Sequence, residues 1–218
     1  MPWLMALDTT AEFGSLALLR DGDLVEEVPL HSPEGFGHVI FGAIESMLAR
    51  HGLTPGNIDC FAGATGPGSF TGVRVGLTVI KGLGEATGHR VVGVSNLQAM
   101  AAFGTGAVRA VILDARRGEV YGAVYDAELR CVQSEVVIRF ADWLSGLPEG
   151  DVEFVGQDFT PFSNALQGKL CVHAPRALAA AIGRIAWGEL SAGRAIDPAA
   201  LDANYVRRSD AEILWKEM

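Results

Sequence analysis

The sequence predicts an α/β fold made of two related halves, the second of them reduced. Short apolar segments typical of buried strands alternate with amphipathic segments typical of helices. The opening order of strand, aspartate, short polar turn and strand occurs twice, because Asp8 follows the apolar segment 4–7 and Asp114 follows the apolar segment 110–113. A repeat of this size indicates two similar βββαβα-type halves.

The element order follows from the same patterns. Gly66, Pro67 and Gly68 form a tight turn between a strand and a helix, and Ser69 or Thr71 is suited to cap that helix. Gly104-Thr105-Gly106 separates the halves 1–104 and 105–218. In the first half we expect strands at 4–7, 15–19, 24–28, 58–62 and 90–94 and helices at 36–50, 72–86 and 97–103. In the second we expect a strand–turn–strand unit at 110–125, strands at 132–138 and 153–156, helices at 140–144 and 174–191, and an irregular tail from 196.

Composition sets the class of protein. The 218 residues are 49% hydrophobic and 20% charged, which is ordinary for a globular chain with a buried core. No apolar run approaches the ~18 residues of a membrane span, and the first residues lack the basic start of a secretory signal. We therefore expect a cytoplasmic protein with no membrane partner. Cys60, Cys131 and Cys171 are odd in number and far apart, so we expect reduced core residues.

The net charge of −9 argues against a broad nucleic-acid footprint, because phosphate binding needs clustered Lys and Arg. Adjacent basic pairs occur only at Arg116-Arg117 and Arg207-Arg208. If the protein serves RNA, we expect a partner to supply most of the basic surface, so that contact with the RNA is indirect. Arg116 and Arg117 either bind an anion or a partner, or form a solvated turn.

Two predicted helices have apolar surfaces wider than one sheet face requires. In the helix at 72–86 the polar residues form one narrow stripe, which consists of Arg74, Thr78, Lys81 and Glu85. The helix at 36–50 also leaves few polar residues outward. Another helix of this chain or a second protein must cover the excess, and Gly76, Gly82 and Gly84 would permit close approach. The predicted interface residues are Val39, Ile40, Ile44, Met47, Val73, Val75, Leu77, Val79 and Ile80.

Motifs of several enzyme classes are absent from the sequence. No phosphate-loop string occurs, and Gly66–Thr71 departs from the dinucleotide pattern GxGxxG because Thr71 takes the last place. The five histidines show no HxxxH or HExxH spacing, and no Gly-x-Ser-x-Gly elbow is present. We therefore expect neither a metal site nor a catalytic residue.

Four stretches together resemble the TsaB (YeaZ) family of the glycoprotease-like superfamily, whose members serve the synthesis of threonylcarbamoyladenosine in tRNA. They are Asp8-Thr9-Thr10, Gly66–Gly76, Asp114–Tyr121 and Tyr205–Arg207. The long glycine motif is the most specific of them, and the resemblance covers nearly the whole chain. It implies an actin-like ATPase fold, of the ASKHA and ribonuclease H-like type, with two hinged halves and a shortened second half.

The resemblance also implies a role and partners. Family members are non-catalytic scaffolds or activators that dimerise with TsaD, which transfers a threonylcarbamoyl group to N6 of the adenine beside the anticodon. Pairing uses the first two helices, here 36–50 and 72–86, and the same helices can form a homodimer when TsaD is absent. TsaE is reached through TsaD, and ATP and metal are expected on the partner subunits. The alternative is a stand-alone actin-like phosphotransferase or ATPase.

For that alternative, the candidate nucleotide-binding residues are Asp8, Thr10, Gly66 and Gly68. Asp8 would hold a metal-bound water in an actin-like kinase; in the other interpretation Asp8 and Thr10 satisfy backbone groups of the turn. The chain departs from the family pattern at Phe36-Gly37 and at Ala203. It also has Asp158 where nucleotide-binding relatives of the fold have glycine, which argues against independent ATP binding.

Overall fold

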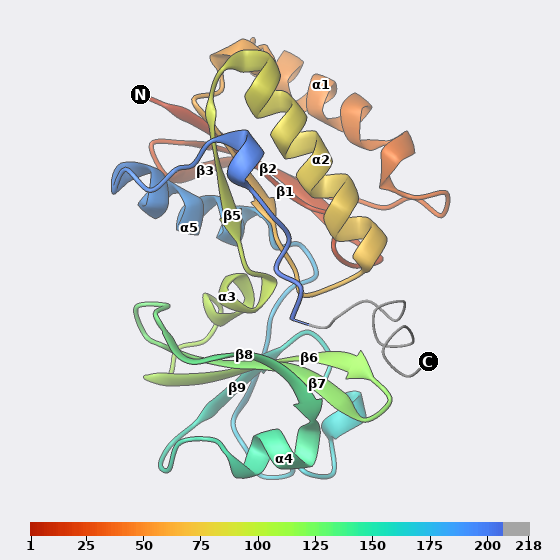
Figure 1. The fold of residues 1–218 in the computed structure, drawn as a ribbon, viewed down its shortest axis with the longest axis vertical. Helices are drawn as coiled ribbons and strands as arrows, with labels where there is room; N and C mark the ends of the chain where they lie inside the picture. The colour runs from red at the N-terminus through yellow and green to blue at the C-terminus, as the bar shows by residue number, and fades with distance from the viewer. Residues whose placement is uncertain (207–218) are drawn as a thin grey trace. The chain divides into compact units, whose positions relative to one another are not determined.

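The computed structural model describes residues 1–206, which divide into two compact units (Figure 1). The first unit contains residues 1–99 and 175–203, and the second contains 100–174 and 204–206. Residues 175–203, which the sequence division at 104 placed in the second half, thus pack with the first unit.

The first unit is built on a five-stranded sheet of order β3-β2-β1-β4-β5. Its strands are β1 (Trp3–Asp8), β2 (Gly14–Arg20), β3 (Asp23–Leu30), β4 (Cys60–Ala64) and β5 (Arg90–Val94). Its helices are α1 (Ile40–Arg50), α2 (Phe70–Thr87), α3 (Asn96–Ala101, whose last two residues belong to the second unit) and α5 (Ala179–Ser191), with 3-10 turns at Phe36–His38, Pro55–Asn57 and Pro198–Ala200. β1 is antiparallel to β2 and parallel to β4, so a meander is followed by a crossover connection.

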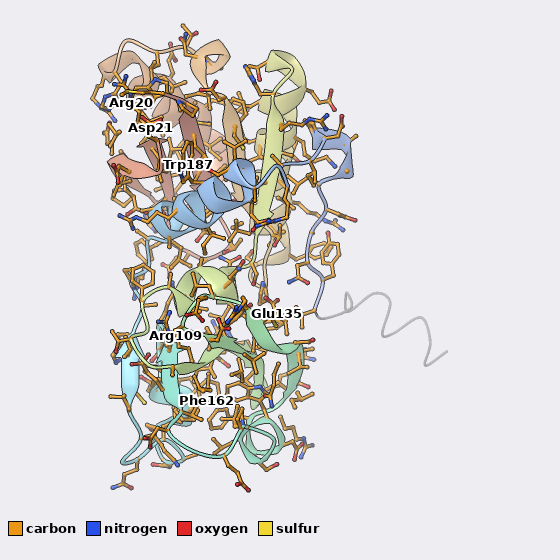
Figure 2. All side chains as sticks on the ribbon, turned by 90° about the vertical axis from the view of Figure 1, so that its left-hand side faces the viewer. Arg20, Asp21, Arg109, Glu135, Phe162 and Trp187 are labelled. Atoms are coloured by element: carbon orange, nitrogen blue, oxygen red, sulfur yellow. The ribbon has the colours of Figure 1, made fainter. Side chains whose placement is uncertain are left out.

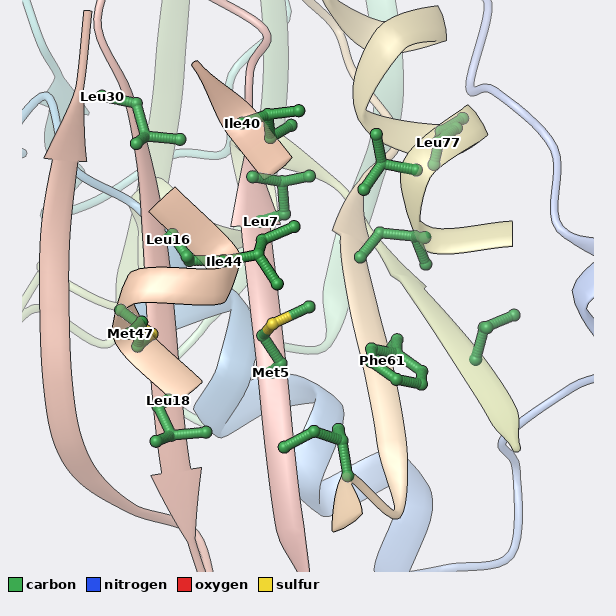
Figure 3. Close-up of a cluster of buried hydrophobic side chains, with 14 of the residues drawn as sticks. Met5, Leu7, Leu16, Leu18, Leu30, Ile40, Ile44, Met47, Phe61 and Leu77 are labelled. Atoms are coloured by element: carbon green, nitrogen blue, oxygen red, sulfur yellow. The ribbon is translucent and has the colours of Figure 1, made fainter. Parts of the chain in front are cut away.

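Helices cover both faces of this sheet because alternate side chains of its strands point to opposite sides. Figure 3 shows Met5 and Leu7 of β1 with Ile44 and Met47 of α1 in one buried cluster. α5 packs on the other face, where a Cβ added at Gly183 would lie 2.3 Å from a methyl group of Leu19. The strands therefore read as continuous apolar runs, as expected for a sheet buried on both sides.

α5 begins at Ala179 rather than at residue 174 because its cap comes from distant strands. Ser15 Oγ on β2 accepts hydrogen bonds from the backbone N–H groups of Leu178 (3.1 Å) and Ala179 (2.9 Å). Glu27 Oε1 on β3 accepts a third, from Ala180 N at 2.9 Å. These acceptors satisfy the free donors of the first turn and fix where the helix starts. A local pattern could not show this.

The tight turn between β2 and β3 lies under Trp187 of α5. Asp21 and Gly22 both have positive φ, and a Cβ added at Gly22 would lie 2.5 Å from Trp187 Cδ1. Figure 2 shows Trp187 beside Arg20 and Asp21. This contact locks the helix against the end of the meander.

The second unit repeats the topology of the first, with a sheet of order β10-β9-β6-β7-β8. Its elements are β6 (Val108–Arg116), β7 (Glu119–Asp126), β8 (Cys131–Arg139), α4 (Phe140–Ser145), β9 (Glu153–Gly156), a 3-10 turn at Thr160–Phe162 and β10 (Cys171–His173). Phe140 and Trp143 of α4 pack on Phe154 and Phe162 in its core. The repeat and its reduced helices confirm the predicted actin-like plan of two related halves.

Three other helix boundaries differ from the sequence expectation by two residues or more, one of which is the end of α3 at Ala101 instead of residue 103. Phe36–His38 forms a 3-10 turn, and α1 starts only at Ile40, because Gly35 and Gly37 disfavour the α-helix and no side chain caps this end. α2 starts at Phe70, before the expected residue 72. None of the described helices has the length and hydropathy needed to cross a bilayer.

Candidate functional site

The glycine motif joins β4 to α2 and packs against the connection between β1 and β2. Ser69 Oγ accepts a hydrogen bond from Gly72 N (3.3 Å), so Ser69 is the cap of α2. Three motif glycines approach the connection so closely that no side chain fits. An added Cβ would lie 2.5 Å from Thr10 O at Gly68, 2.0 Å from Thr9 O at Gly72 and 2.5 Å from Thr9 Oγ1 at Gly76. Gly68 and Gly72 therefore make room for this chain's own backbone, and Gly76 makes room for the Thr9 side chain.

Asp8 lies at the end of β1 in a buried hydrogen-bond network. Its Oδ1 accepts hydrogen bonds from Thr10 N (2.9 Å) and Thr10 Oγ1 (2.7 Å), and Asn96 Nδ2 donates to the same oxygen at 3.4 Å. Asn96 also donates to Thr10 Oγ1 (2.7 Å) and accepts from Gly66 N (3.0 Å). Burial raises the pKa of Asp8, and the hydrogen bonds from Thr10 and Asn96 offset part of that rise.

All four candidate nucleotide-binding residues are thus engaged inside the first unit. Asp8, Thr10 and Gly66 share the Asn96 network, and Gly68 packs on Thr10. An open pocket of about 700 Å³ does lie beside the motif, but none of the four lines it. Its walls come from segment 31–38 and from Thr9, Ala11, Glu12, Ser69, Thr71, Gly72 and Val75. The network is the arrangement expected if these residues serve the turn.

Titratable side chains elsewhere give no reactive cluster in the part of the chain that the structure describes. Within residues 1–206, no three His, Cys, Asp or Glu side chains come together as a metal site. Burial raises the pKa of the Cys60 thiol to about 12, so Cys60 stays protonated and unreactive. Cys131 is exposed, so the expectation of three core cysteines is wrong for that residue. Asp158 Oδ1 accepts a hydrogen bond from Thr160 N (2.8 Å) and shapes its own turn.

The outward faces of α1 and α2 form an open apolar groove in the first unit. The groove has a volume of about 830 Å³ and is lined by Gly37, Ile40, Phe41, Phe70, Thr71, Arg74, Val75, Thr78, Val79, Gly82, Leu83 and Ala86. A second hollow of about 380 Å³ shares Phe41 and Leu83 with it. Phe41 is 61% exposed and Phe70 is 44% exposed. The Arg74 guanidinium lies 3.7 Å from the centre of the Phe70 ring and adds a positive charge to the rim.

Most of the predicted interface residues are core residues of this chain. Seven of the nine are at most 6% exposed: Ile40, Ile44, Met47, Val73, Leu77, Val79 and Ile80. Val39 and Val75 are half-buried. These seven side chains are buried within this chain, so they are not the free apolar surface that the prediction assigned to them; Ile40 and Val79 border the groove but are 0% and 6% exposed. The two helices do have a second apolar side, but other residues form it.

Helix geometry explains which residues were missed. Ile40, Ile44, Met47 and Leu48 follow the i, i+4, i+7, i+8 spacing of one stripe, so this stripe faces the sheet. Phe41 is one residue out of phase and therefore turns toward solvent. This phase difference is visible in the sequence and identifies Phe41 as the exposed apolar residue of α1.

Segment 196–203 covers part of α2, although the sequence did not indicate which segment of the chain would do so. Lys81 Nζ donates hydrogen bonds to the carbonyl oxygens of Ala199 (3.4 Å) and Leu201 (2.8 Å). A Cβ added at Gly84 would lie 2.8 Å from Pro198 Cγ, whereas a Cβ added at Gly82 would meet no atom within 4 Å. Gly84 thus admits this chain's own segment, and Gly82 is the α2 glycine that stays open. Arg207 and Arg208 lie outside the described residues.

Comparisons with known proteins give a consistent picture. A family model described as "TsaD: tRNA N6-adenosine threonylcarbamoyltransferase" matches residues 28–192. The chain is 29% identical over 231 aligned positions to the tRNA threonylcarbamoyladenosine biosynthesis protein TsaB of Bacillus subtilis, covering 98% of both chains. A Pseudomonas aeruginosa structure described as similar to peptidase YEAZ superposes with TM-score 0.79 and 25% identity, over 95% of this chain and 100% of that one.

The fold extends to more distant proteins. An activator of 2-hydroxyisocaproyl-CoA dehydratase from Clostridium difficile, with bound ADPNP, superposes with TM-score 0.52 at 12% identity. It covers 88% of this chain and 97% of that chain. At this identity the likeness concerns the fold alone.

Proposed function

This chain belongs to the family that the TsaD model describes, as a TsaB (YeaZ) member of the glycoprotease-like superfamily, and on that premise we propose that it is a non-catalytic subunit docking on TsaD. The process it serves is the biosynthesis of threonylcarbamoyladenosine in tRNA. The observation that carries the proposal is the open apolar groove on the outward faces of α1 and α2.

The groove has the character of a protein docking site. It is lined mainly by apolar atoms of two parallel helical faces, with an exposed aromatic ring on each helix. Apolar surface of this extent on a soluble protein is typical of an interaction site, and a helix pair offers a rigid groove to a partner helix. The polar residues Thr71, Arg74 and Thr78 stand among the apolar residues and can fix the register of a partner.

TsaD is the occupant that the family relationship favours. The TsaD model matches residues 28–192, a range that includes α1 and α2. A protein of that family is therefore expected to carry a related helix pair, and two related pairs can pack face to face as a pseudo-symmetric dimer. TsaE would then be reached through TsaD.

The contribution of this chain is binding energy rather than a reacting group. Docking can stabilise one conformation of TsaD over another only if the contacts differ between the two conformations. ATP, metal and the transfer chemistry would then lie on the partner subunits. The inward engagement of Asp8, Thr10, Gly66 and Gly68 supports this division of roles.

The test uses Gly82→Arg, which places a charged side chain in the groove. A Cβ at Gly82 meets no atom within 4 Å, and arginine is the better helix former, so the fold should be retained. Gly188→Arg in α5 is the matched control, because Gly188 is also helical, exposed and open. We expect Gly82→Arg to abolish co-elution with TsaD in size-exclusion chromatography and Gly188→Arg to preserve it. Co-elution of both variants would refute docking at this groove.

The stand-alone ATPase alternative makes a different prediction. Calorimetry of the isolated chain with magnesium and ATP should show no tight binding if Asp8 and Thr10 serve the turn. Tight binding accompanied by turnover in the absence of TsaD would establish the alternative. Sedimentation of the isolated chain tests self-association through the groove, because a homodimer formed there should be lost in Gly82→Arg.

A further inference from the structure

The hairpin between β6 and β7 can be followed in Figure 1. It carries two arginines in an unfavourable backbone conformation. Arg116 pairs with Glu119, which leaves Arg117 and Gly118 as a two-residue loop. The φ angles of Arg116, Arg117 and Gly118 are 68°, 55° and 77°. Positive φ at both loop positions is the pattern of a type I′ turn, in which Asn-Gly or Asp-Gly is favoured. Arginine lacks the short polar side chain that lets Asn or Asp form local hydrogen bonds in this left-handed conformation, so nothing local stabilises Arg117 there.

The same chain uses the favoured residues at a comparable turn. Arg20 pairs with Asp23 in the β2–β3 hairpin, and its loop residues Asp21 and Gly22 have φ angles of 53° and 86°. The favoured pair Asp-Gly therefore stands in one two-residue turn and Arg-Gly in the other. Backbone strain retained at a surface turn is a reason to look for a function of the side chain.

The hairpin arginines also differ from three other arginines of this acidic chain, which form close ion pairs. Arg50, Arg130 and Arg194 each have a carboxylate oxygen within 2.7 Å. Arg116, by contrast, reaches only Asp114, at 3.6 Å, with its side chain 87% exposed, and Arg117 is exposed. Arg139 is exposed next to them, because it pairs with Glu119 across β7 and β8. Asp114 and Glu119 offset part of this positive charge.

The turn is held rigidly despite its strain. Asp114 Oδ1 accepts a hydrogen bond from Arg116 N (2.8 Å), and Gly118 O accepts one from Phe140 N (3.2 Å). The guanidinium groups are therefore presented from a fixed backbone, which lowers the entropy lost when they bind an anion. Guanidinium binds phosphate oxygens in a bidentate manner, and two successive arginines suit two neighbouring phosphates.

We propose that the β6–β7 hairpin is a direct contact for the phosphate backbone of RNA. The identity of that RNA as tRNA rests on the proposed function. The contact is small and independent of base sequence, which is compatible with a chain of net charge −9. It replaces the expectation that RNA meets this chain only through a partner, because one edge of the second unit then touches the RNA itself.

The decisive variant is Arg116→Asn with Arg117→Asn, because asparagine favours positive φ. We expect the double variant to melt at least as high as the wild type, by up to a few degrees, since strain is relieved. The full chain in its complex with TsaD should bind unmodified tRNA on the order of 10-fold more weakly in fluorescence anisotropy. The slope of log affinity against log salt should fall by about 1 for each arginine removed.

Two controls separate charge from fold and from docking. Lysine at both positions keeps the charge and the strain but not the bidentate geometry, so it should bind tRNA more tightly than the asparagine variant and more weakly than the wild type. Arg184→Gln removes one exposed charge from α5 and should leave the affinity unchanged. Unchanged tRNA binding by the asparagine variant would overturn the proposal. The proposal would also be overturned if the asparagine variant co-eluted poorly with TsaD while the fraction of complex that still formed bound tRNA as tightly as the wild-type complex. The hairpin would then be a protein contact. Failure of wild-type chain and TsaD to form a complex would instead count against the proposed function.

Discussion

Replacing Gly72 by alanine is expected to destabilise the free protein, because the space beside Gly72 is filled by backbone. An added Cβ would lie 2.0 Å from Thr9 O, whereas ordinary contact begins at 3.4 Å, so the two must separate by about 1.4 Å. Thr9 cannot yield by rotating a side chain, since the obstacle is its carbonyl oxygen. The end of β1 or the first turn of α2 must move instead.

The magnitude follows from three contributions. Overpacking of this kind costs about 1–3 kcal/mol. Movement also breaks the hydrogen bond from Thr9 Oγ1 to Gly72 O (2.7 Å), which contributes about 1 kcal/mol. The gain in helix propensity offsets about 1 kcal/mol. A net loss of about 2 kcal/mol should lower Tm by about 4–8 °C in a chain of this size.

Gly82→Ala is the matched control on the same helix. No atom lies within 4 Å of its added Cβ, so only the propensity gain of about 1 kcal/mol applies and Tm should rise by about 2–4 °C. Thermal unfolding followed by circular dichroism measures both variants. The packing explanation of the glycine motif fails if Gly72→Ala melts at or above the wild type. That result would instead indicate that the glycines of the motif allow the close approach of a ligand rather than of Thr9.

Three further substitutions test the electrostatics and the polar core. Glu26→Gln should cost about 1 kcal/mol at pH 7, because hydrogen bonding to Arg50 lowers the pKa of Glu26. That stability is present above the ordinary value of 4.5 and is lost as pH falls through the lowered pKa, so the difference from wild type in urea unfolding should shrink as the pH is taken below 4.5. Burial raises the pKa of Asp8, so the contribution of Asp8 to the free energy of unfolding is greatest below the ordinary value of 3.8 and is lost as pH rises through the raised pKa. The stability of Asp8→Asn relative to wild type should therefore improve from pH 4.5 to pH 8. A constant difference between the two proteins would contradict this. Glu153→Gln should lower the free energy of unfolding by about 2–3 kcal/mol, because the carboxylate accepts hydrogen bonds from Thr105 N (2.8 Å), Thr105 Oγ1 (3.0 Å) and Gly106 N (3.1 Å). A decrease of less than about 1 kcal/mol in urea unfolding would show that other hydrogen bonds replace these.

The sequence predicted the strands of this fold well, because their apolar runs are short, dense and bounded by turns. β5 (Arg90–Val94) and β9 (Glu153–Gly156) match the predicted ranges, and β10 alone was missed. β10 is a three-residue strand paired in parallel with β9, so no periodicity can develop within it. The start of α5 was wrong because its cap is supplied by Ser15 and Glu27, far away in sequence.

The sequence indicated the two helices that carry the apolar groove, but not the residues that line it. A wide apolar arc shows that a helix is covered on two sides, and it does not show which side meets the sheet. Val73, Leu77 and Ile80 form the buried stripe of α2 that packs on the sheet, so Gly82 and Ala86 lie on the other side and line the groove. The glycine motif was similarly misleading in isolation, because glycines that approach a phosphate and glycines that approach a neighbouring backbone look alike in sequence.

The return of residues 175–203 to the first unit has a consequence for biosynthesis. One face of the first sheet stays uncovered until α5 has left the ribosome, although every strand of that sheet is made by residue 94. At a synthesis rate of about 5–20 residues per second, the nascent chain carries this apolar face for several seconds. Premature stop codons before the end of α5 should therefore yield aggregation-prone fragments rather than an isolated, working first unit.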